Sequence, residues 1–283
     1  MKRISAAMLA IIIALASLNT ARAADYTYTG LDYPGASQTQ ALGINSGGTV
    51  VGTYSDATGI HGFSLSNGTY AAVNYPGIGR QTFPTAVSSG GTIVGYYNTV
   101  MGHGFSLRGG TYTALNYSGA LATYAYGIND GGTIVGWYWN YDRGLHGFSL
   151  RGGSYTTLNY PGALATYAYA INNRGTIVGT YSDASGIHGF SLSNGTYAAV
   201  NYPGAWWTNA TGINDEGTIV GYYYDAKGYH GFSLSNGTYA AVNYPGASET
   251  DAYGINNEGT IVGWYTDAGG VHGFLATPGR DPG

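Results

Sequence analysis

The histidines are the first residues of this chain whose type and spacing could do chemistry. They are His61, His103, His146, His188, His230 and His272, each in a His-Gly-Phe tripeptide, at intervals of 42, 43, 42, 42 and 42 residues. Imidazole is a common metal ligand and general base. An active site, however, is normally single, and equal spacing keeps the rings apart instead of clustering them as ligands. We therefore expect a structural role, with each ring packed between repeats and hydrogen-bonded to the backbone.

Polar residues in turns give a second set of candidates. Asp56, Asp183, Asp225 and Asp267 precede His-Gly-Phe in the pattern Asp-x-x-Gly. Calcium loops supply more oxygen ligands than this spacing offers, whereas aspartate often binds the backbone of its own turn. We predict turns here, with no metal and no other cofactor. The Asn-Gly-Thr tripeptides at Asn67, Asn194 and Asn236 match glycosylation acceptors, but Asn-Gly is also a strong hairpin signal, and we interpret them as turns.

The elements that position these residues are short strands in a repeat of about 42 residues. In the unit 166–203, strands are expected at 167–171, 176–181, 187–192 and 197–202. They alternate with period two, are rich in β-branched and aromatic residues, and are separated by turns that contain glycine. Helical repeats would show a period of 3.6, and a β-helix would need shorter rungs. Four short antiparallel strands per repeat are typical of a β-propeller blade.

The two ends of the chain indicate how the repeats close. The last repeat stops after its third strand, near Leu275, and residues 28–35 align with the fourth strand at 70–77. We therefore predict an all-β fold: a six-bladed β-propeller of four-stranded antiparallel blades, closed by the N-terminal strand completing the last blade. Such closure removes open sheet edges that would otherwise aggregate.

The recurring motifs resemble a known family. His-Gly-Phe, Gly-Ile-Asn-x-x-Gly-Thr-Ile-Val-Gly and Asn-Tyr-Pro-Gly-Ala are similar to the bacterial extracellular HAF repeats, named after His-Ala-Phe, and the likeness covers nearly the whole chain after residue 23. All six copies here have glycine where that name has alanine. The resemblance implies an exported repeat protein, and it brings no catalytic residues.

A comparison of the repeats with one another suggests where a ligand binds. In a propeller, the turns between the first and second strands and between the third and fourth strands lie on one face, and here they are nearly uniform. The second-to-third turns and the crossovers between blades lie on the other face, and they vary. Varied loops on a uniform scaffold are the usual form of a binding surface.

Trp206 and Trp207 form the most distinctive crossover on that variable face. Neighbouring residues of an extended segment point in opposite directions, so at least one indole should be exposed, where it could stack on a sugar ring with Asn209 nearby. The alternative is that both indoles plug the channel or cover a neighbouring blade. Trp137, Trp139 and Trp264 lie within predicted strands, and we expect them to pack in the core.

Charged residues on the variable face leave an enzyme as the alternative function. Glu249 and Asp251 on one crossover are candidates for an acid–base pair in catalysis, but no Ser/His/Asp arrangement is apparent. Only Arg80 and Arg143 lie on this face, whereas a sialidase pocket needs several converging arginines. Tyr141, beside Arg143, completes the predicted ligand-binding set.

The N-terminus predicts export. Lys2 and Arg3 precede an apolar run, residues 4–18, which is followed by Ala21-Arg22-Ala23. This is the pattern of a signal peptide, residues 1–23, with one propeller domain at 24–283. The run is too short to serve well as a membrane anchor. Cysteine is absent, so the fold must close without disulfides.

The low charge of the chain limits the classes of ligand that it could bind. Charged residues make up 8% of the chain, and removal of Lys2, Arg3 and Arg22 leaves 7 basic against 14 acidic side chains. No basic stripe exists for a nucleic acid. We interpret the chain as a monomeric, extracellular or periplasmic module that binds a glycan, a cell-surface polymer or another neutral polar ligand. A secreted glycoside hydrolase, lyase or lactonase and a passive adhesion scaffold remain the alternatives.

Overall fold

The computed structural model describes residues 22–23, 26–77, 81–141 and 144–279, and the regular structure in these ranges is entirely β-strand. No helix in the described ranges is long and apolar enough to cross a membrane. The predicted signal peptide lies outside the described residues except for β1 (Arg22–Ala23), which pairs in parallel with a later strand, β22. Arg80 and Arg143 also lie outside the described residues.

The other strands pair antiparallel in groups of four, which we name units 1 to 6. Units 3, 4 and 5, with β1, are joined into one 13-stranded sheet by single parallel pairs, Leu145 with Ala165 and Ile187 with Trp207. Unit 1 contains β3 (Gln38–Ile44), β4 (Val50–Asp56), β5 (Gly59–Ser66) and β6 (Thr69–Ala72). Unit 2 contains β7 (Gln81–Val87), β8 (Ile93–Asn98), β9 (Gly102–Arg108) and β10 (Thr111–Leu115). Unit 3 contains β11 (Ala122–Ile128), β12 (Ile134–Trp139), β13 (Leu145–Arg151) and β14 (Ser154–Leu158).

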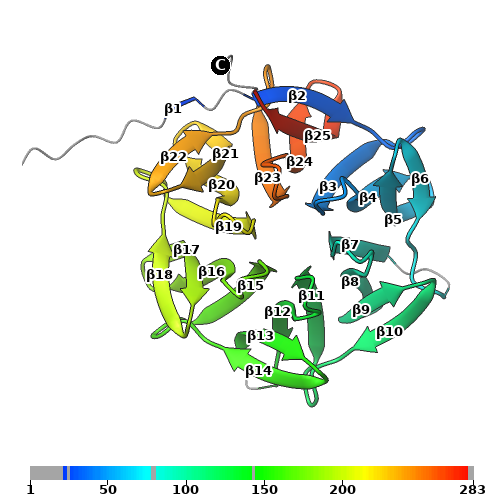
Figure 1. Cartoon of the computed structure of the whole chain (residues 1–283), viewed down its shortest axis with the longest axis vertical. Helices are drawn as coiled ribbons and strands as arrows, with labels where there is room; N and C mark the ends of the chain where they lie inside the picture. Colours follow the sequence, from blue (N-terminus) through cyan, green and yellow to red (C-terminus); the bar gives the residue numbers. More distant parts are fainter. Residues whose placement is uncertain (1–21, 24–25, 78–80, 142–143, 280–283) are drawn as a thin grey trace, which may run out of the picture.

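The second half of the chain continues in the same way. Unit 4 contains β15 (Ala165–Ile171), β16 (Ile177–Asp183), β17 (Gly186–Ser193) and β18 (Thr196–Val200). Unit 5 contains β19 (Trp207–Ile213), β20 (Ile219–Asp225), β21 (Gly228–Ser235) and β22 (Thr238–Ala241). Unit 6 contains β23 (Glu249–Ile255), β24 (Ile261–Asp267), β25 (Gly270–Pro278) and β2 (Tyr26–Leu31). Figure 1 shows the units arranged around a central space, with the first strand of each unit innermost.

The predicted local signals hold in detail. The strands of unit 4 begin and end within two residues of the predicted positions. At the predicted hairpin turn, Asn194 has φ 48° and Gly195 has φ 77°, the positive values that a two-residue type I′ turn needs. Gly179 is required for a different reason, because a Cβ there would lie 2.0 Å from the carbonyl oxygen of Tyr167 on the neighbouring strand.

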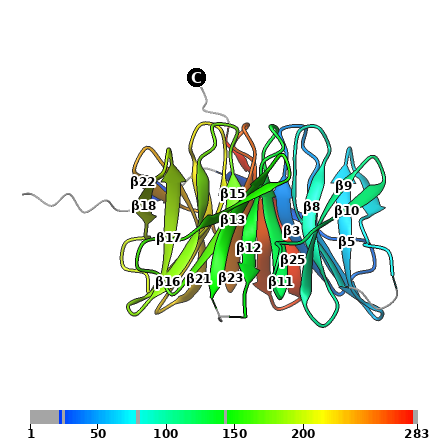
Figure 2. The ribbon, with the colours of Figure 1, turned by 90° about the horizontal axis from the view of Figure 1, so that it is seen from below.

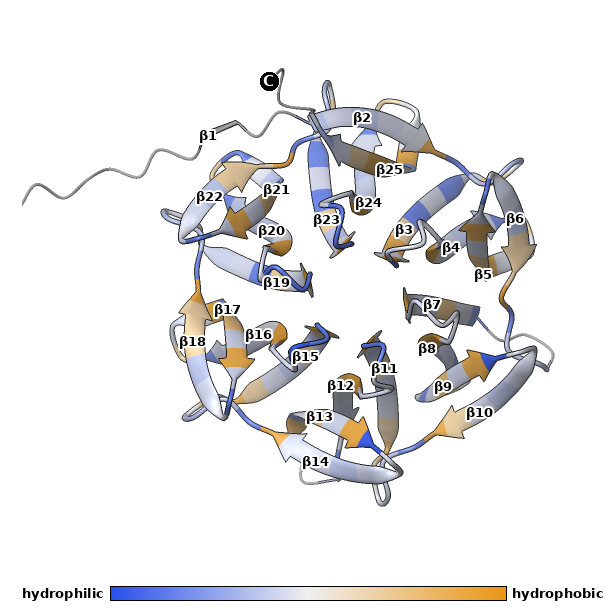
Figure 3. Ribbon diagram, in the orientation of Figure 1, coloured by the Kyte–Doolittle hydropathy of each residue, from blue (hydrophilic) through white to orange (hydrophobic). Residues whose placement is uncertain are grey.

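The alternating strand direction produces two faces (Figure 2). We call the side with the second-to-third turns and the inter-unit crossovers the crossover face. The other side, with the Asn-x-x-Gly and Asn-Gly or Gly-Gly turns, is the opposite face. Figure 3 shows hydrophilic turns after β11, β15 and β19 around the central space of the opposite face.

The core lies between neighbouring units. The phenylalanine of each His-Gly-Phe tripeptide is fully buried, and Phe232 of unit 5 packs in one cluster with Ala210 and with Val178 of unit 4. The crossover tyrosines add aromatic stacking: Tyr160 lies parallel to Tyr181 with 3.6 Å between ring centroids. Because each apolar cluster is shared by two units, no unit can bury its core alone.

A row of asparagines also joins the units on the opposite face. Asn172 accepts a hydrogen bond from the backbone of Thr176 in its own turn (2.9 Å) and donates its amide to the carbonyl of Asn214 in the next unit (2.9 Å). Asn214 repeats this contact onto unit 6. Asn256 of unit 6 in turn donates to the carbonyl of Asn45 in unit 1, at 3.4 Å.

The two ends of the chain meet in unit 6. β2 pairs antiparallel with β25, with Tyr26 opposite Pro278 and Leu31 opposite Gly273. Val262 of unit 6 then packs in one apolar cluster with Leu31 and with Ala41 and Phe63 of unit 1. β2 is therefore the fourth strand of unit 6.

Candidate functional site

The inner two strands of each unit carry two sets of side chains. In β23, Thr250 and Ala252 point into the packing between units, and their counterparts are nearly constant: the buried threonines Thr39, Thr82, Thr123, Thr166, Thr208 and Thr250 are all alike. Glu249, Asp251 and Tyr253 alternate with these residues and vary between the units. Since strand residues alternate in direction, the variable residues share one side of the strand.

The variable set has three main positions. The counterparts of Asp251 are Gln40, Phe83, Tyr124, Tyr167 and Asn209. The counterparts of Tyr253 are Leu42, Thr85, Tyr126, Tyr169 and Thr211. On the second strand, the counterparts of Trp264 are Thr53, Tyr96, Trp137, Thr180 and Tyr222. Of these residues, only Asn209 and Asp251 were named as candidate site residues in the sequence analysis, because variation was sought in the loops. Comparing alternate positions of the strands would have found the others.

A central cavity lies where the variable residues meet. It has a volume of about 250 Å³ and is lined by Leu42, Thr85, Tyr126, Tyr169, Thr211, Tyr222 and Tyr253. Two smaller spaces, of about 80 and 70 Å³, continue between the innermost strands toward the asparagine turns of the opposite face. Tyrosine hydroxyls dominate the polar part of the cavity wall.

The cavity tyrosines are neutral hydrogen-bonding groups. Burial raises the pKa of Tyr126, Tyr169, Tyr222 and Tyr253, so they do not ionise near neutral pH. Tyr253 is hydrogen-bonded to Tyr222 and to the indole of Trp264, which supports its hydroxyl from behind. Fixed hydroxyls on flat rings can bind a polar ligand without adding charge.

Two of the predicted core tryptophans contact the tyrosines of the cavity wall from outside the cavity. Trp137 stacks on Tyr124 at 4.0 Å and hydrogen-bonds Tyr126, as Trp264 does Tyr253. All three strand tryptophans, Trp139 included, are only half-buried and lie outside the apolar clusters. The expectation that they fill the core was therefore wrong, because these strand positions lie on the variable side.

Asp251 is the most unusual residue of the site. Its side chain lies deep between the units, with 4% of the residue exposed, and Oδ1 has no hydrogen-bond partner among the described residues. Burial, with a further contribution from the nearby Glu249 carboxylate, raises the pKa of Asp251 to about 8. Asp251 in turn raises the pKa of Tyr222, Tyr229 and Tyr253, so these three residues lie near enough to interact with it electrostatically.

A continuous series of aromatic rings leads from the cavity to the crossover face. Tyr253 lies 5.8 Å from Tyr222, and Tyr222 lies 6.3 Å from Tyr229. Tyr229 contacts Tyr224 at 4.6 Å between ring centroids. Trp206 and Trp207 then contact Tyr224 at 5.4 and 4.9 Å. The series thus joins the crossover tryptophans to the neighbourhood of Glu249 and Asp251.

The tryptophan pair is open to solvent. Trp206 is 57% exposed and Trp207 is 38% exposed, so neither plugs the channel. The other strongly exposed large apolar residues in the described ranges are Val100, Tyr141 and Leu164, and all three lie in turns or crossovers of the same face. Exposed apolar side chains gathered on one face of a protein usually mark an interaction site.

The remaining predicted site residues are divided by the structure. Asn209 lies in β19 of unit 5 and accepts a hydrogen bond from Thr180 of unit 4 at 3.1 Å. Tyr141 follows β12, which lies across the ring from β23 (Figure 1), so it does not join the group around Asp251. The structure therefore brings together Trp206, Trp207, Glu249 and Asp251 but not Tyr141.

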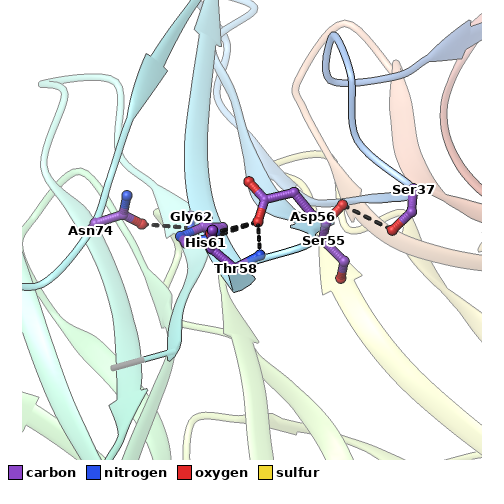
Figure 4. Close-up of polar contacts among 7 residues, drawn as sticks. All are labelled: Ser37, Ser55, Asp56, Thr58, His61, Gly62 and Asn74. Atoms are coloured by element: carbon purple, nitrogen blue, oxygen red, sulfur yellow. Dashed lines mark hydrogen bonds and ion pairs between the residues drawn. The ribbon is translucent and has the colours of Figure 1, made fainter. Parts of the chain in front are cut away.

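The histidines form small surface clusters. His61 Nε2 lies 2.8 Å from Thr58 Oγ1 and 3.2 Å from Asp56 Oδ1, and Thr58 Oγ1 donates to the same carboxylate at 2.6 Å (Figure 4). The ring also packs on Tyr54, at 5.2 Å. The predicted backbone hydrogen bond is wrong for His61, because its partners are side chains of the preceding turn.

These clusters do not form a catalytic triad. In unit 4, the Ser185 hydroxyl donates to Asp183 and also lies 2.9 Å from His188 Nε2, so the acid contacts the nucleophile. A triad needs the acid on the other ring nitrogen, where it orients the imidazole. At His272, Asp32 and Asp267 contact opposite ring nitrogens and do not converge. Within the described ranges, no group of three acidic or histidine side chains could hold a metal ion.

Comparison with known proteins defines the fold class. No protein-family model matches the chain, and no curated protein matches it. Among solved structures it is similar to virginiamycin B lyase from Staphylococcus aureus, with TM-score 0.53, 12% identity, and coverage of 89% of this chain and 99% of that one. It is similar to AofleA from Arthrobotrys oligospora, with TM-score 0.56, 14% identity, and coverage of 90% and 89%.

A third similar structure is the Aleuria aurantia lectin in complex with α-methyl-L-fucoside, with TM-score 0.51, 13% identity, and coverage of 87% of this chain and 93% of the lectin. At these identities the likeness shows the fold alone. The chain is an all-β protein of the β-propeller class, a class that includes both binding proteins and enzymes.

Proposed function

We propose that this chain is an exported, six-bladed β-propeller that binds a glycan or a similar polar ligand in the central cavity and on the crossover face. Units 1 to 6 are the blades of this proposal. The pairing of β2 with β25 and the contacts of unit 6 with unit 1 support closure of the ring. Export rests on the signal-peptide pattern of residues 1–23.

The observation that carries the proposal is the unbroken aromatic series from Trp206 and Trp207 to the cavity tyrosines. The apolar face of a sugar ring stacks on indole or phenol, while its hydroxyl groups need nearby donors and acceptors. Both kinds of group are available here, since the residues that line the cavity include four tyrosines and the threonines Thr85 and Thr211. The lectin among the similar structures shows that the fold class can bind a fucoside.

The repeats themselves supply conservative substitutions for a test. Leu164 and Ala165 of unit 4 occupy the positions of Trp206 and Trp207, so Trp206→Leu and Trp207→Ala introduce residues that this crossover already accommodates. Tyr253→Leu likewise introduces the residue of unit 1, Leu42. Leu164→Ala is the matched control, because it removes an exposed apolar side chain from the same face outside the aromatic series.

The experiment is a glycan array probed with residues 24–283, followed by titration of any ligand found. We expect Trp207→Ala and Tyr253→Leu to weaken binding by about 1–3 kcal/mol, the range of an aromatic hot spot. The Leu164→Ala control should bind as the parent does. Binding that survives both aromatic substitutions, or an array without any bound glycan, would refute the proposed site and the proposed function respectively.

A hydrolase is the second candidate, and one observation favours it. The raised pKa of Asp251 beside Glu249 is typical of a general acid paired with a second carboxyl group. A panel of glycoside, lactone and polysaccharide substrates tests this alternative with the same protein. Turnover that is abolished in Asp251→Asn would replace the binding function with an enzymatic one.

A further inference from the structure

We propose that Asp251 and Glu249 bind the ammonium group of an amine-bearing ligand, such as an aminoalkyl or amino sugar, within the tyrosine rings beside the central cavity. The inference rests on the proposed function, because it concerns the same cavity and names the class of ligand. It extends that function from a neutral ligand to a cationic one.

The first observation is an acid without a partner. The exposed fraction of Asp251 is 4%, and its Oδ1 has no hydrogen-bond donor in the described part of the chain. The described arginine, lysine and histidine side chains form no ion pair with it. A buried polar atom without a partner is costly, and such atoms in native proteins call for a missing ion, water or ligand.

At the equivalent position in the preceding unit, the side-chain oxygen has a hydrogen-bond donor. Asn209 in β19 receives a hydrogen bond from Thr180, which the second strand of unit 4 supplies. For Asp251, the second strand of unit 5 supplies Tyr222 in place of that threonine. The chain therefore replaces a neutral, satisfied amide by an unsatisfied acid at one position of the ring.

The second observation is the aromatic character of the neighbouring residues. Tyr222 on β20 has the place beside Asp251 that Thr180 has beside Asn209, and Tyr253 follows Asp251 on the same side of β23. Both tyrosines, and Tyr229 on β21, interact electrostatically with Asp251. The face of an aromatic ring attracts cations, so aromatic rings near a carboxylate suit an ammonium ion better than a hydroxyl group. Glu249 begins the same strand and points to the same side, which adds a second negative charge nearer the crossover face.

Binding of a cation should displace a proton. The titratable groups that face Asp251 are Glu249 and Tyr253 on β23, Tyr222 on β20 and Tyr229 on β21. The pKa of each tyrosine is raised, so these rings stay neutral up to pH 8. Asp251 itself holds a proton in the free protein at neutral pH, because burial and Glu249 raise its pKa to about 8. An ammonium ion favours the ionised carboxyl group and releases that proton.

The test uses two probes that differ in one charge: 2-aminoethyl β-glucoside and its N-acetylated derivative. The alkyl amine, like that of lysine, has a pKa of about 10 and stays charged at pH 7. Calorimetric titration of residues 24–283 in two buffers with different ionisation enthalpies gives both affinity and the number of protons released. We expect the amine to bind about 10- to 100-fold more tightly, as for one charge-assisted hydrogen bond, with release of most of one proton.

Asp251→Asn is the decisive variant, because Asn209 already occupies the equivalent position of unit 5. It should bind the two probes within about threefold of each other, since the charge-assisted bond is gone, and release no proton. Asp267→Asn, which makes the same change of charge on the same face outside the cavity, should keep the preference of the parent and so excludes a general effect of net charge.

Equal affinity for the two probes, binding of the amine without proton release, or an unchanged preference in Asp251→Asn would each overturn the inference. If neither probe binds, the inference is also overturned. The glycan array decides separately on the proposed function: neutral glycans that bind without preference for the amine would leave that function standing and remove only the ammonium site.

Discussion

The Asp251→Asn variant tests whether a buried acid stays protonated in this fold, independently of any ligand. The pKa of this carboxyl group rises from 3.8 in a model compound to about 8 in the folded chain. The folded state therefore holds a proton that the unfolded chain releases. The contribution of the protonated carboxyl group to stability is fully present below pH 4 and is lost as the pH rises toward 8.

The magnitude follows from the linkage relation. Between pH 5 and pH 7 the folded carboxyl group is protonated and the unfolded one is ionised, so the free energy of unfolding falls by about 1.36 kcal/mol per pH unit. Asparagine does not titrate. The parent should therefore lose about 2.7 kcal/mol relative to Asp251→Asn over these two pH units, or roughly 5–10 °C in melting temperature for a chain of this size.

The assay is urea unfolding of both proteins at pH 5, 6 and 7, followed by tryptophan fluorescence. Asp267→Asn serves as the control, since its carboxylate lies on a surface turn beside His272. Only the Asp251→Asn curve should diverge from that of the parent. Parallel pH dependence of the parent and Asp251→Asn would show that Asp251 ionises normally, which would refute its burial without a partner.

Three further predictions concern the scaffold. Deletion of residues 26–33 should remove the partner of β25 and expose its edge, which should lower the free energy of unfolding by several kcal/mol and promote association. Urea unfolding measures the loss of stability and light scattering the association. A truncated chain that stays monomeric with unchanged stability would contradict closure. His188→Ala should lower the free energy of unfolding by about 1–2 kcal/mol, because the ring packs against Tyr181 and hydrogen-bonds Ser185. Zn²⁺ should leave the melting temperature of the parent unchanged, and a rise would indicate a metal site. Gly179→Ala should lower the free energy of unfolding by about 3 kcal/mol or prevent folding, because its Cβ would meet the carbonyl of Tyr167. Gly204→Ala has open space around the new Cβ but φ 81°, and it should lower the free energy of unfolding by about 1–2 kcal/mol. Equal losses of stability in the two variants would contradict the packing argument.

The scaffold was predictable from the sequence because its signals are local and repeated. Asn194-Gly195 selects a turn type, alternate residues select strand faces, and Pro203 ends pairing, whatever the rest of the chain does. The pairing of β2 with β25 was also predicted, since a spare fourth strand and a missing one can satisfy each other. Repetition adds weight to each of these signals.

The sequence predicted Trp206, Trp207, Glu249 and Asp251 as site candidates but not the cavity tyrosines. Exposure of Trp206 followed from its place in a crossover, but the burial of Asp251 depends on how close β23 comes to the neighbouring unit, which no local pattern expresses. Trp264 was assigned to the core because a tryptophan in a strand usually packs there. Its actual place, hydrogen-bonded to the cavity residue Tyr253, depends on which side of the strands carries the cavity residues, and that side is known only once the units are assembled.

The asparagine contacts of the opposite face have a consequence for how such a chain can change. Five of the six units carry both halves of the joint: an amide that donates to the next unit, as in Asn172, and a carbonyl that can accept from the preceding unit, as in Asn214. Copies of this kind can therefore stand next to one another, so duplication or recombination within the gene produces neighbours that already fit at this joint. Unit 2 differs, because Ser88 stands in place of the asparagine; there the backbone N–H and the hydroxyl of Ser89 donate to the carboxylate of Asp130 in unit 3, at 2.7 and 3.0 Å. Exchange of a single copy would change the cavity residues of one unit, and with them the specificity, without any change to the hydrogen bonds that join that unit to its neighbours.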